Sequence, residues 1–427
     1  MRVLVAALGS RGDVQPGLAL ASRLRRAGHE AIVSAPVDFA AWAAELGLPF
    51  AVSDDTSVEK LLKENIEDFS SNPLRVLRFM GSLVHDHMPM WYMRTLEAAG
   101  GCDAIVSAGQ FASVSAAEKL GIPCFGVAFS PTMLRSREHA PIMFPWQRMP
   151  PGVNAAMWWF LARAIGLMTK PINASRRRLG LGPVRAAFEH IFDVPFLLAA
   201  DAELVRIPAD WRGRAITPTG PWFYDDPAPL DAEVEAWLAA GDAPVYVGFG
   251  SMVHDDVARL TRIIVEGAAR QGRRVLMSKG WAGLGEGQLP AYVKVVHGPM
   301  PHAKLFPRMA AVVHHGGSGT TAQALRAGVP QVIVPHIMDQ FYYAERLLQL
   351  GLAPRGIPVK QLSAQKLAAA LDATFALDPA PRRAAAQRLR AGDGIARAIA
   401  ILEASIKNRG QTTFSRGEEK RGLSPVS

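Results

Sequence analysis

The sequence predicts an α/β protein built from two similar units, each with a parallel sheet. In the opening segment, a buried strand pattern leads through a glycine-rich turn into a helical pattern and then into a second strand. The same order returns in the second half of the chain, from Val245 onward. A spacing also repeats, because Gly121 follows Ala104 by 17 residues and Gly328 follows Ala311 by 17. This duplication is typical of two Rossmann-like domains.

The first unit opens with a strand pattern at Arg2–Ala7. A turn with Gly9, Gly12 and Gly17 follows. The apolar spacing then predicts a helix over Leu18–Arg26 and a second strand over Ala31–Ser34. A strand, a helix and a parallel strand in this order form the usual crossover unit of such sheets.

The second unit repeats this order. A strand is expected at Val245–Phe249, a turn at Gly250 and Ser251, a helix at Asp255–Arg270 and a strand at Arg274–Met277. In parallel sheets, ligands bind beyond the carboxyl ends of the strands. We therefore expect the two units to face each other across a cleft that holds the functional site.

Proline content marks the boundary between the units, since residues 217–229 carry four prolines. We divide the chain into a first domain at 1–216, a linker at 217–240 and a second domain at 241–378. Two helices are expected within 379–406, on either side of Gly392 and Gly394. Residues 407–427 have almost no apolar periodicity and are expected to form a disordered tail.

Composition excludes several classes of protein. The chain has 427 residues, two cysteines and a formal net charge of +9. Two cysteines without metal-ligand spacing exclude a disulfide scaffold and a structural zinc site, and favour the reducing cytoplasm. The positive charge comes from scattered arginines rather than a basic stripe with aromatics, so nucleic acid is not the expected partner. The longest apolar stretch, Val153–Met168, contains Arg163 and is too short to predict a membrane span. A peripheral contact with the inner face of a membrane is still compatible with the sequence.

The glycine-rich turn of the second half carries the clearest functional pattern. A strand ends at two histidines, and Gly316, Gly317 and Gly319 alternate with hydroxyl side chains before a helix. Free N–H groups and the helix dipole at such a start favour a diphosphate. The pattern is not a Walker loop, because no lysine follows the glycines. The structural alternative is a tight turn with a serine cap.

Two acidic residues in turns are further candidates. Asp13 lies in the first glycine turn, where it is either a helix cap or a general base. Asp339 and Gln340 follow the strand at Gln331–Val334. This pair is either the cap of the next helix or a set of hydrogen-bond partners for the vicinal hydroxyls of a sugar.

Together these motifs resemble the UDP-sugar glycosyltransferases of the GT-B fold. The resemblance is greatest to sterol glucosyltransferases and to bacterial glycosyltransferases of antibiotic and glycolipid biosynthesis. It covers nearly all of residues 1–375 and rests on GSRGDVQP, GFGSM, PHAKLF at Pro301–Phe306, and HHGGSGT followed by RAGVPQ and DQFYYAERLLQLG.

The resemblance implies an inverting transfer of a hexose, with UDP-glucose as the expected donor and without a metal ion or other cofactor. Asp13 matches the family's base in the first loop. The residues matching the donor site are Ser10, Ser251, His315, Gly317, Ser318, Gly319, Thr320, Asp339 and Gln340. Among them, His315, Ser251 and the Gly317–Thr320 turn would hold the diphosphate, and Asp339 and Gln340 the sugar hydroxyls.

The chain departs from the family in the nucleoside region. Gln323 stands where many members have a ribose-binding glutamate, Pro299 replaces the base-stacking tryptophan of plant members, and Met338 replaces a common glycine. Met300 and His302 become the candidates for holding the base. These differences leave dTDP open beside UDP.

The acceptor is expected in the first domain, as the family binds it there. The segments Thr56–Arg94 and Pro131–Gly180 are rich in methionine and aromatic residues, which suit either a core or an adaptable apolar pocket. Met88, Trp91, Phe144 and Trp146 are the candidates for contact with a sterol, polyketide or lipid-like alcohol.

Three alternatives remain from the sequence. The donor could be a dTDP-sugar used in antibiotic or glycolipid synthesis. A sugar-nucleotide epimerase or phosphorylase would use the same nucleotide pocket. A helper subunit would keep the fold without the chemistry.

Overall fold

A computed structural model describes residues 1–65, 73–109 and 111–419, and confirms the two-domain α/β prediction. The first domain has a seven-stranded parallel sheet in the order β3-β2-β1-β4-β5-β6-β7. Its strands are β1 (Arg2–Ala7), β2 (Glu30–Ala35), β3 (Phe50–Val52), β4 (Ala104–Ala108), β5 (Cys124–Ala128), β6 (Phe196–Leu198) and β7 (Ile216–Pro218). Its helices are α1 (Arg11–Arg26), α2 (Ala40–Glu45), α3 (Val58–Glu64), α4 (Pro73–Ala98), α5 (Ala112–Leu120), α6 (Pro151–Gly166), α7 (Thr169–Arg178) and α8 (Ala187–Phe192).

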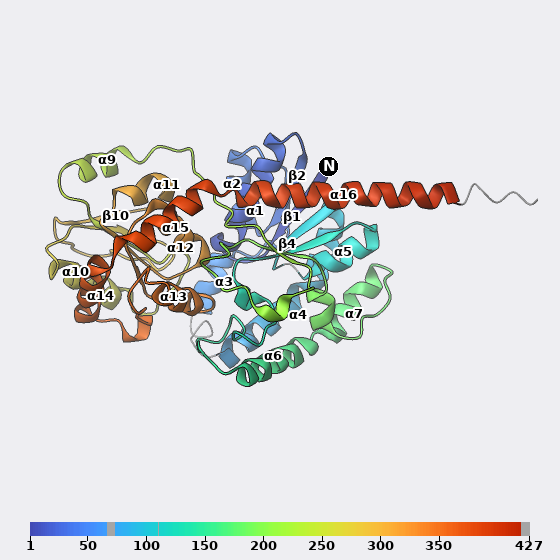
Figure 1. Cartoon of the computed structure of the whole chain (residues 1–427), viewed down its shortest axis with the longest axis horizontal. Coiled ribbons are helices and arrows are strands. Elements are labelled where there is room, and N and C mark those ends of the chain that lie inside the picture. Colours follow the sequence, from blue (N-terminus) through green and yellow to red (C-terminus); the bar gives the residue numbers. More distant parts are fainter. Residues whose placement is uncertain (66–72, 110, 420–427) are drawn as a thin grey trace, which may run out of the picture.

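The second domain has a five-stranded parallel sheet in the order β10-β9-β8-β11-β12. Its strands are β8 (Val245–Gly248), β9 (Val275–Ser278), β10 (Val293–Val296), β11 (Ala311–His314) and β12 (Gln331–Ile333). Its helices are α9 (Ala232–Ala239), α10 (Val257–Ala269), α11 (His302–Leu305), α12 (Ser318–Ala327), α13 (Gln340–Gln349), α14 (Ala364–Ala376) and α15 (Pro379–Ala391). The two domains lie side by side, with the sheets in separate halves of the molecule (Figure 1).

Helix α1 begins earlier than its apolar pattern predicts. It starts at Arg11 rather than Leu18, and Pro16 lies inside it. A proline so near a helix start removes only one hydrogen bond of the helix. Gly12 and Gly17 have no side chains that could mark an apolar face, so the apolar pattern becomes clear only from Leu18. The early start places Asp13 in the first turn of the helix.

The ends of the predicted linker belong to the domains. Residues 217 and 218 pair with β6 as part of β7, so the strand crosses the predicted boundary. At the other end, Val234 and Leu238 of α9 are buried in the core of the second domain. Between them, Trp222 packs into the core of the first domain.

The C-terminal helix α16 (Gly394–Glu419) differs most from expectation. It returns from the second domain and packs against α1, where Ile395, Ala398, Ile399 and Leu402 join the core of the first domain (Figure 1). It also continues through residues 407–419, which were expected to be disordered, while residues 420–427 lie outside the described part of the chain.

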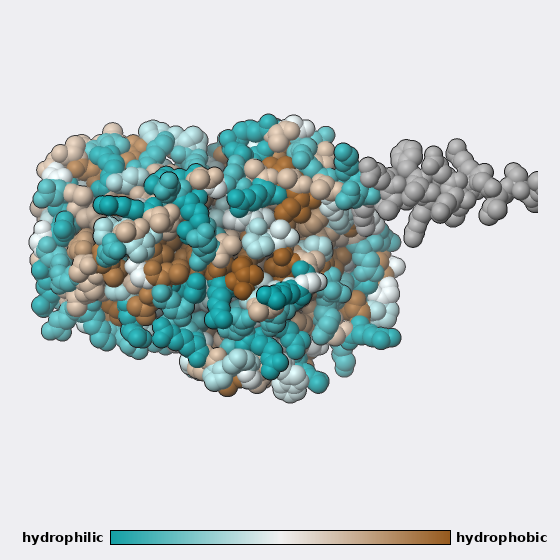
Figure 2. Space-filling model, in the orientation of Figure 1, coloured by the Kyte–Doolittle hydropathy of each residue, from teal (hydrophilic) through white to brown (hydrophobic). Residues whose placement is uncertain are grey.

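Contacts between the domains form around α13. The hydroxyl of Tyr343 donates to the carbonyl of Phe129 over 2.6 Å, and the backbone N–H of Arg206 donates to the hydroxyl of Tyr342 over 3.0 Å. Apolar residues gather near this junction on the face shown in Figure 2, while most of the remaining surface there is hydrophilic. The domains therefore meet over a shared apolar cluster beside the cleft.

Candidate functional site

A cavity of about 1830 Å³ lies between the domains and is lined by residues from both. Its position follows from the strand order. In the first sheet β2 and β3 lie on one side of β1 and the later strands on the other, so the strand order switches between β1 and β4. In the second sheet it switches between β8 and β11 in the same way. Ligands of parallel α/β sheets bind at such switch points. The loops after β1, β8, β11 and β12 all contribute to the wall.

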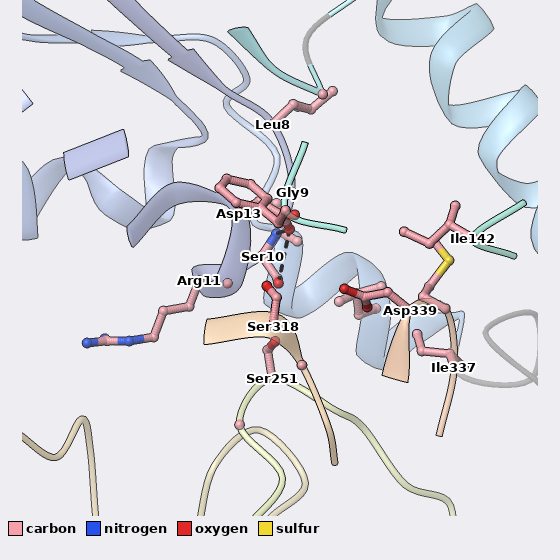
Figure 3. A pocket seen from close by; sticks show the side chains of 18 of the residues that line it. Leu8, Gly9, Ser10, Arg11, Asp13, Ile142, Ser251, Ser318, Ile337 and Asp339 are labelled. Atoms are coloured by element: carbon pink, nitrogen blue, oxygen red, sulfur yellow. Dashed lines mark hydrogen bonds between the residues drawn. The ribbon is translucent and has the colours of Figure 1, made fainter. Parts of the chain in front are cut away.

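Asp13 is held at this wall by the residue that begins its helix. The backbone N–H of Ser10 donates to Asp13 Oδ2 over 2.9 Å, and the Ser10 hydroxyl donates to the same oxygen over 3.3 Å (Figure 3). Burial raises the pKa of Asp13 to about 6, against the lowering effect of these hydrogen bonds. The residue is thus both a helix cap and a carboxylate of raised basicity that lines the cavity.

Gly9 makes room for this carboxylate. Its φ of +132° is a conformation that side chains rarely adopt, and a Cβ on it would lie 2.4 Å from Asp13 Oδ2. Any other residue at this position would therefore displace the carboxylate.

The start of α12 forms the opposite wall. Gly317, Ser318, Gly319 and Thr320 all line the cavity, with Ser251 from the loop after β8. In Figure 3, Ser318 and Ser251 lie directly below Ser10. Because the first N–H groups of a helix have no partner within it, this wall presents hydrogen-bond donors and the positive end of the helix dipole.

His315 lines the cavity beside that helix start. A Cβ on Gly317 would lie 2.6 Å from His315 Nε2, so the ring occupies the space that this glycine leaves. Burial, followed by the neighbouring His314, His336 and His302, holds the pKa of His315 well below its usual range. Its Nδ1 has no hydrogen-bond partner among the described residues. The neutral ring can donate one N–H to a ligand.

His314, the other histidine of the pair, has a structural role instead. It is fully buried, its Nε2 lies 2.8 Å from Gln331 Oε1, and its Nδ1 accepts the backbone N–H of Gly316. The pair thus separates one histidine that shapes the turn from one that lines the cavity.

Asp339 lies across the cavity from Asp13, on the loop before α13 (Figure 3). Burial raises its pKa to about 7, and the nearby negative charge of Asp13 adds to the rise. The preceding Met338 has a φ of +56°. This left-handed conformation costs a residue with a side chain about 1–2 kcal/mol, which explains why glycine suits that position.

Gln340 lines the cavity, but its side-chain oxygen is already engaged. The oxygen accepts the backbone N–H groups of His336 and Ile337 over 2.7 Å and 3.0 Å. Its amide nitrogen lies 3.2 Å from the sulfur of Met252. Gln340 therefore shapes the loop that carries Asp339, and only the amide N–H not directed at Met252 remains for a ligand.

Met300 and His302 line the cavity on the side of the second domain. The His302 ring stacks on Phe306 at 4.4 Å between ring centroids, and its Nε2 lies 3.3 Å from the Tyr246 hydroxyl. Sequence reasoning missed three polar residues that line the cavity, namely Arg11 of the first domain and His254 and His336 of the second. The only signal for Arg11 was its place beside Asp13, and neither histidine belongs to a recognisable motif.

The apolar part of the cavity lies in the first domain. Met88 and Trp91 line it, and Trp158, Leu161 and Ile165 of α6 extend the wall. The other two acceptor candidates do not line the cavity. Phe144 and Trp146 stack on each other at 5.6 Å between centroids and lie outside the lining, with Phe144 buried and Trp146 half exposed to solvent.

Within the described residues there is no cluster of three or more His, Cys, Asp or Glu side chains that could hold a metal ion. In the same part of the chain, no helix is long and apolar enough to cross a membrane.

Comparison with known proteins gives the family. Residues 3–136 match the glycosyltransferase family 28 N-terminal domain, and residues 275–398 match the erythromycin biosynthesis protein CIII-like C-terminal domain. The chain is 37% identical to Glycosyltransferase GtfE of Amycolatopsis orientalis over 95% of its own length and 98% of the relative's. It is a GT-B glycosyltransferase.

Two further likenesses show the breadth of this family. The glycosyltransferase is 30% identical to the sterol 3-beta-glucosyltransferase UGT80B1 of Arabidopsis thaliana, over 93% of its length and 67% of the plant protein. Among solved structures, the glycosyltransferase of kitacinnamycin superposes with a TM-score of 0.70 at 21% identity, covering 94% of this chain and 98% of that one. The predicted resemblance to antibiotic and sterol glycosyltransferases is confirmed.

Proposed function

We propose that this glycosyltransferase moves a hexose, glucose first, from UDP to a hydroxyl of a bulky hydrophobic acceptor. The transfer is a single inverting displacement that uses no metal ion. One observation carries the proposal. Asp13 of the first domain and Asp339 of the second line one cavity, together with the donor-rich start of α12 and an apolar wall.

Asp13 is the general base in this proposal. As the acceptor oxygen attacks the anomeric carbon, Asp13 takes the hydroxyl proton, and the bond from that carbon to the phosphate oxygen breaks. A pKa of about 6 keeps Asp13 ionised at neutral pH and makes it a stronger base than an exposed carboxylate. The hydrogen bonds from Ser10 fix the orientation of the carboxylate.

The leaving diphosphate is stabilised by the start of α12. Its free N–H groups, the hydroxyls of Ser318 and Thr320, and Ser251 offer donors that are already in place before the charge develops. His315 adds one N–H. Asp339 accepts hydrogen bonds from the sugar hydroxyls, and the fact that it lines the same cavity as Asp13 supports a sugar bound between the two carboxylates.

The names of similar proteins support the proposed classes of acceptor and donor. A vancomycin aglycone glucosyltransferase of Amycolatopsis orientalis is 34% identical, and with the sterol relative it supports glucose and a large acceptor. A dTDP-sugar is the second candidate. A dTDP-epi-vancosaminyltransferase of the same organism is 34% identical, and the glycosyltransferase VinC was crystallised with dTDP.

An acceptor panel tests the proposal. The enzyme is incubated with UDP-glucose or dTDP-glucose and with sterols, polyketide alcohols, small sugars and peptides, and products are identified by mass. We expect a hexose adduct on apolar alcohols, with an inverted anomeric centre by NMR. Transfer only to small polar sugars or peptides would contradict the acceptor class, and no nucleotide release with any acceptor would indicate a helper subunit.

Substituting Gly9 tests the position of the base. In Gly9→Ala the new Cβ would push the Asp13 carboxylate aside, and we expect kcat to fall by about tenfold or more with little change in nucleotide affinity. Gly28→Ala is the matched control, since Gly28 at the other end of α1 also has positive φ (+84°) but open space around it. Equal losses of kcat in both variants would mean that helix strain, not the carboxylate, explains the effect.

Substituting His315 tests the diphosphate site. His315→Ala removes one donor beside the start of α12, and we expect the Kd for UDP to rise by roughly tenfold. Calorimetry measures the change. His314→Ala is not a fair control, because that residue is buried in the fold. His29, a partly buried histidine far from the cavity whose Nε2 lies 2.9 Å from Glu403 Oε1, serves instead. Unchanged UDP affinity in His315→Ala would remove this residue from the donor site.

A further inference from the structure

Helix α6 exposes a row of large apolar side chains on its outer face. Val153, Trp159 and Phe160 are 44%, 57% and 42% exposed, and Leu167, just after the helix, is 82% exposed. At 100° per residue, these four positions fall within a sector of about 120°. Arg163 lies in the same sector, with its guanidinium 5.2 Å from the centroid of the Trp159 ring. Figure 1 shows α6 at the lower edge of the molecule.

The opposite face of the same helix belongs to the cavity. Trp158, Leu161 and Ile165 line its apolar part, and Trp158 is fully buried. Leu167 is both strongly exposed and part of the cavity lining, so it marks an opening of the cavity at the end of α6. An apolar outer surface and an apolar inner wall thus meet at one helix.

The segment that contains this helix is strongly basic, and the adjoining α8 carries one exposed acidic residue, Glu189. Residues 139–188 contain seven arginines and lysines and no aspartate or glutamate, in a chain with 38 acidic residues overall. Arg163, Lys170, Arg177 and Arg178 are exposed, and none of them makes an ion pair with another described residue. A second copy of the chain offers the same positive charge to this face, so self-association through it is electrostatically unfavourable.

We propose that the outer face of α6 docks onto an anionic lipid bilayer. Trp159 and Phe160 enter the interfacial region, where aromatic side chains are favoured, and the surrounding cations lie against the headgroups. Docking brings the cavity opening at Leu167 to the membrane surface. A lipophilic acceptor then reaches the cavity without crossing water, a consequence that rests on the proposed function.

Vesicle sedimentation of the full chain, without donor or acceptor, tests the docking. We expect binding to vesicles with phosphatidylglycerol, weaker binding to pure phosphatidylcholine, and release by salt. The double variant Trp159→Ala/Phe160→Ala should weaken binding by about tenfold or more. Arg163→Gln/Lys170→Gln should abolish the preference for anionic lipid. Leu120→Ala/Arg270→Gln, which changes an exposed leucine and an exposed arginine elsewhere, should bind as the unmodified protein does.

Two results would overturn the docking. One is equal or absent binding of the unmodified protein to both kinds of vesicle. The other is a dimer in sedimentation velocity that the Trp159→Ala/Phe160→Ala variant loses, since a second copy would then cover the face.

Turnover on a water-soluble acceptor separates the docking proposal from the proposed function. We expect the α6 variants to keep it, whereas vesicle binding by a protein that glycosylates no acceptor would leave docking intact and remove the proposed function.

Discussion

Replacing Asp13 with asparagine is expected to lower kcat by roughly 10²-fold or more, the usual contribution of a general base. The amide cannot take the acceptor proton. Its oxygen can still accept the N–H of Ser10, so the start of α1 and the fold should survive. Nucleotide affinity should stay near that of the unmodified enzyme, because Asp13 lies on the wall opposite the diphosphate site. Initial rates and UDP calorimetry measure the two quantities.

The pH profile gives an independent check of the same residue. The base must be ionised, so kcat/KM of the unmodified enzyme should fall as the pH drops below about 6, the pKa of Asp13. Asp38→Asn is the matched control. Asp38 also accepts a backbone N–H near a helix start, from Val58, but on an exposed surface. An Asp13→Asn enzyme with full activity would show that Asp13 is only a cap.

Replacing Asp339 with asparagine is expected to lower transfer by about tenfold to 10²-fold and to raise the melting temperature at pH 8. The loss of rate follows from weaker hydrogen bonds to the sugar hydroxyls. The gain in stability follows from the pKa of about 7, which lies above the ordinary value of 3.8. A carboxyl group with a raised pKa stabilises the fold in its protonated form. This contribution is complete below pH 4 and is lost as the pH rises through 7. Asparagine removes the buried charge that remains at pH 8.

The stability difference should therefore depend on pH. The melting temperature of Asp339→Asn should exceed that of the unmodified enzyme by a few degrees at pH 8, and the difference should shrink as the pH falls from about 7 toward 4. UDP without a sugar should bind both proteins equally. A constant difference in melting temperature across this range, or a weaker affinity for UDP, would contradict the assignment of Asp339 to the sugar.

Local patterns in the sequence predict most of the elements that carry the site. Glycine turns after buried strands mark where parallel sheets bind ligands, so Asp13, Ser251 and the Gly317–Thr320 turn could be named in advance. Side-chain direction is less accessible. Phe144 and Trp146 share the composition of an apolar pocket, yet they stack on each other outside it. Gln340 sits at the expected place, but backbone N–H groups take its oxygen.

The sequence by itself determined the two α/β units, their glycine turns and the family to which the enzyme belongs. Only the tertiary structure decided that Asp13 and Asp339, 326 residues apart, line one cavity. It also decided that α16 returns to the first domain and that Met338 adopts a left-handed backbone. The reason is that periodicity and turn chemistry act over a few neighbouring residues. The placement of the domains depends instead on apolar surfaces, such as Tyr343 against the end of β5, that distant segments bury together.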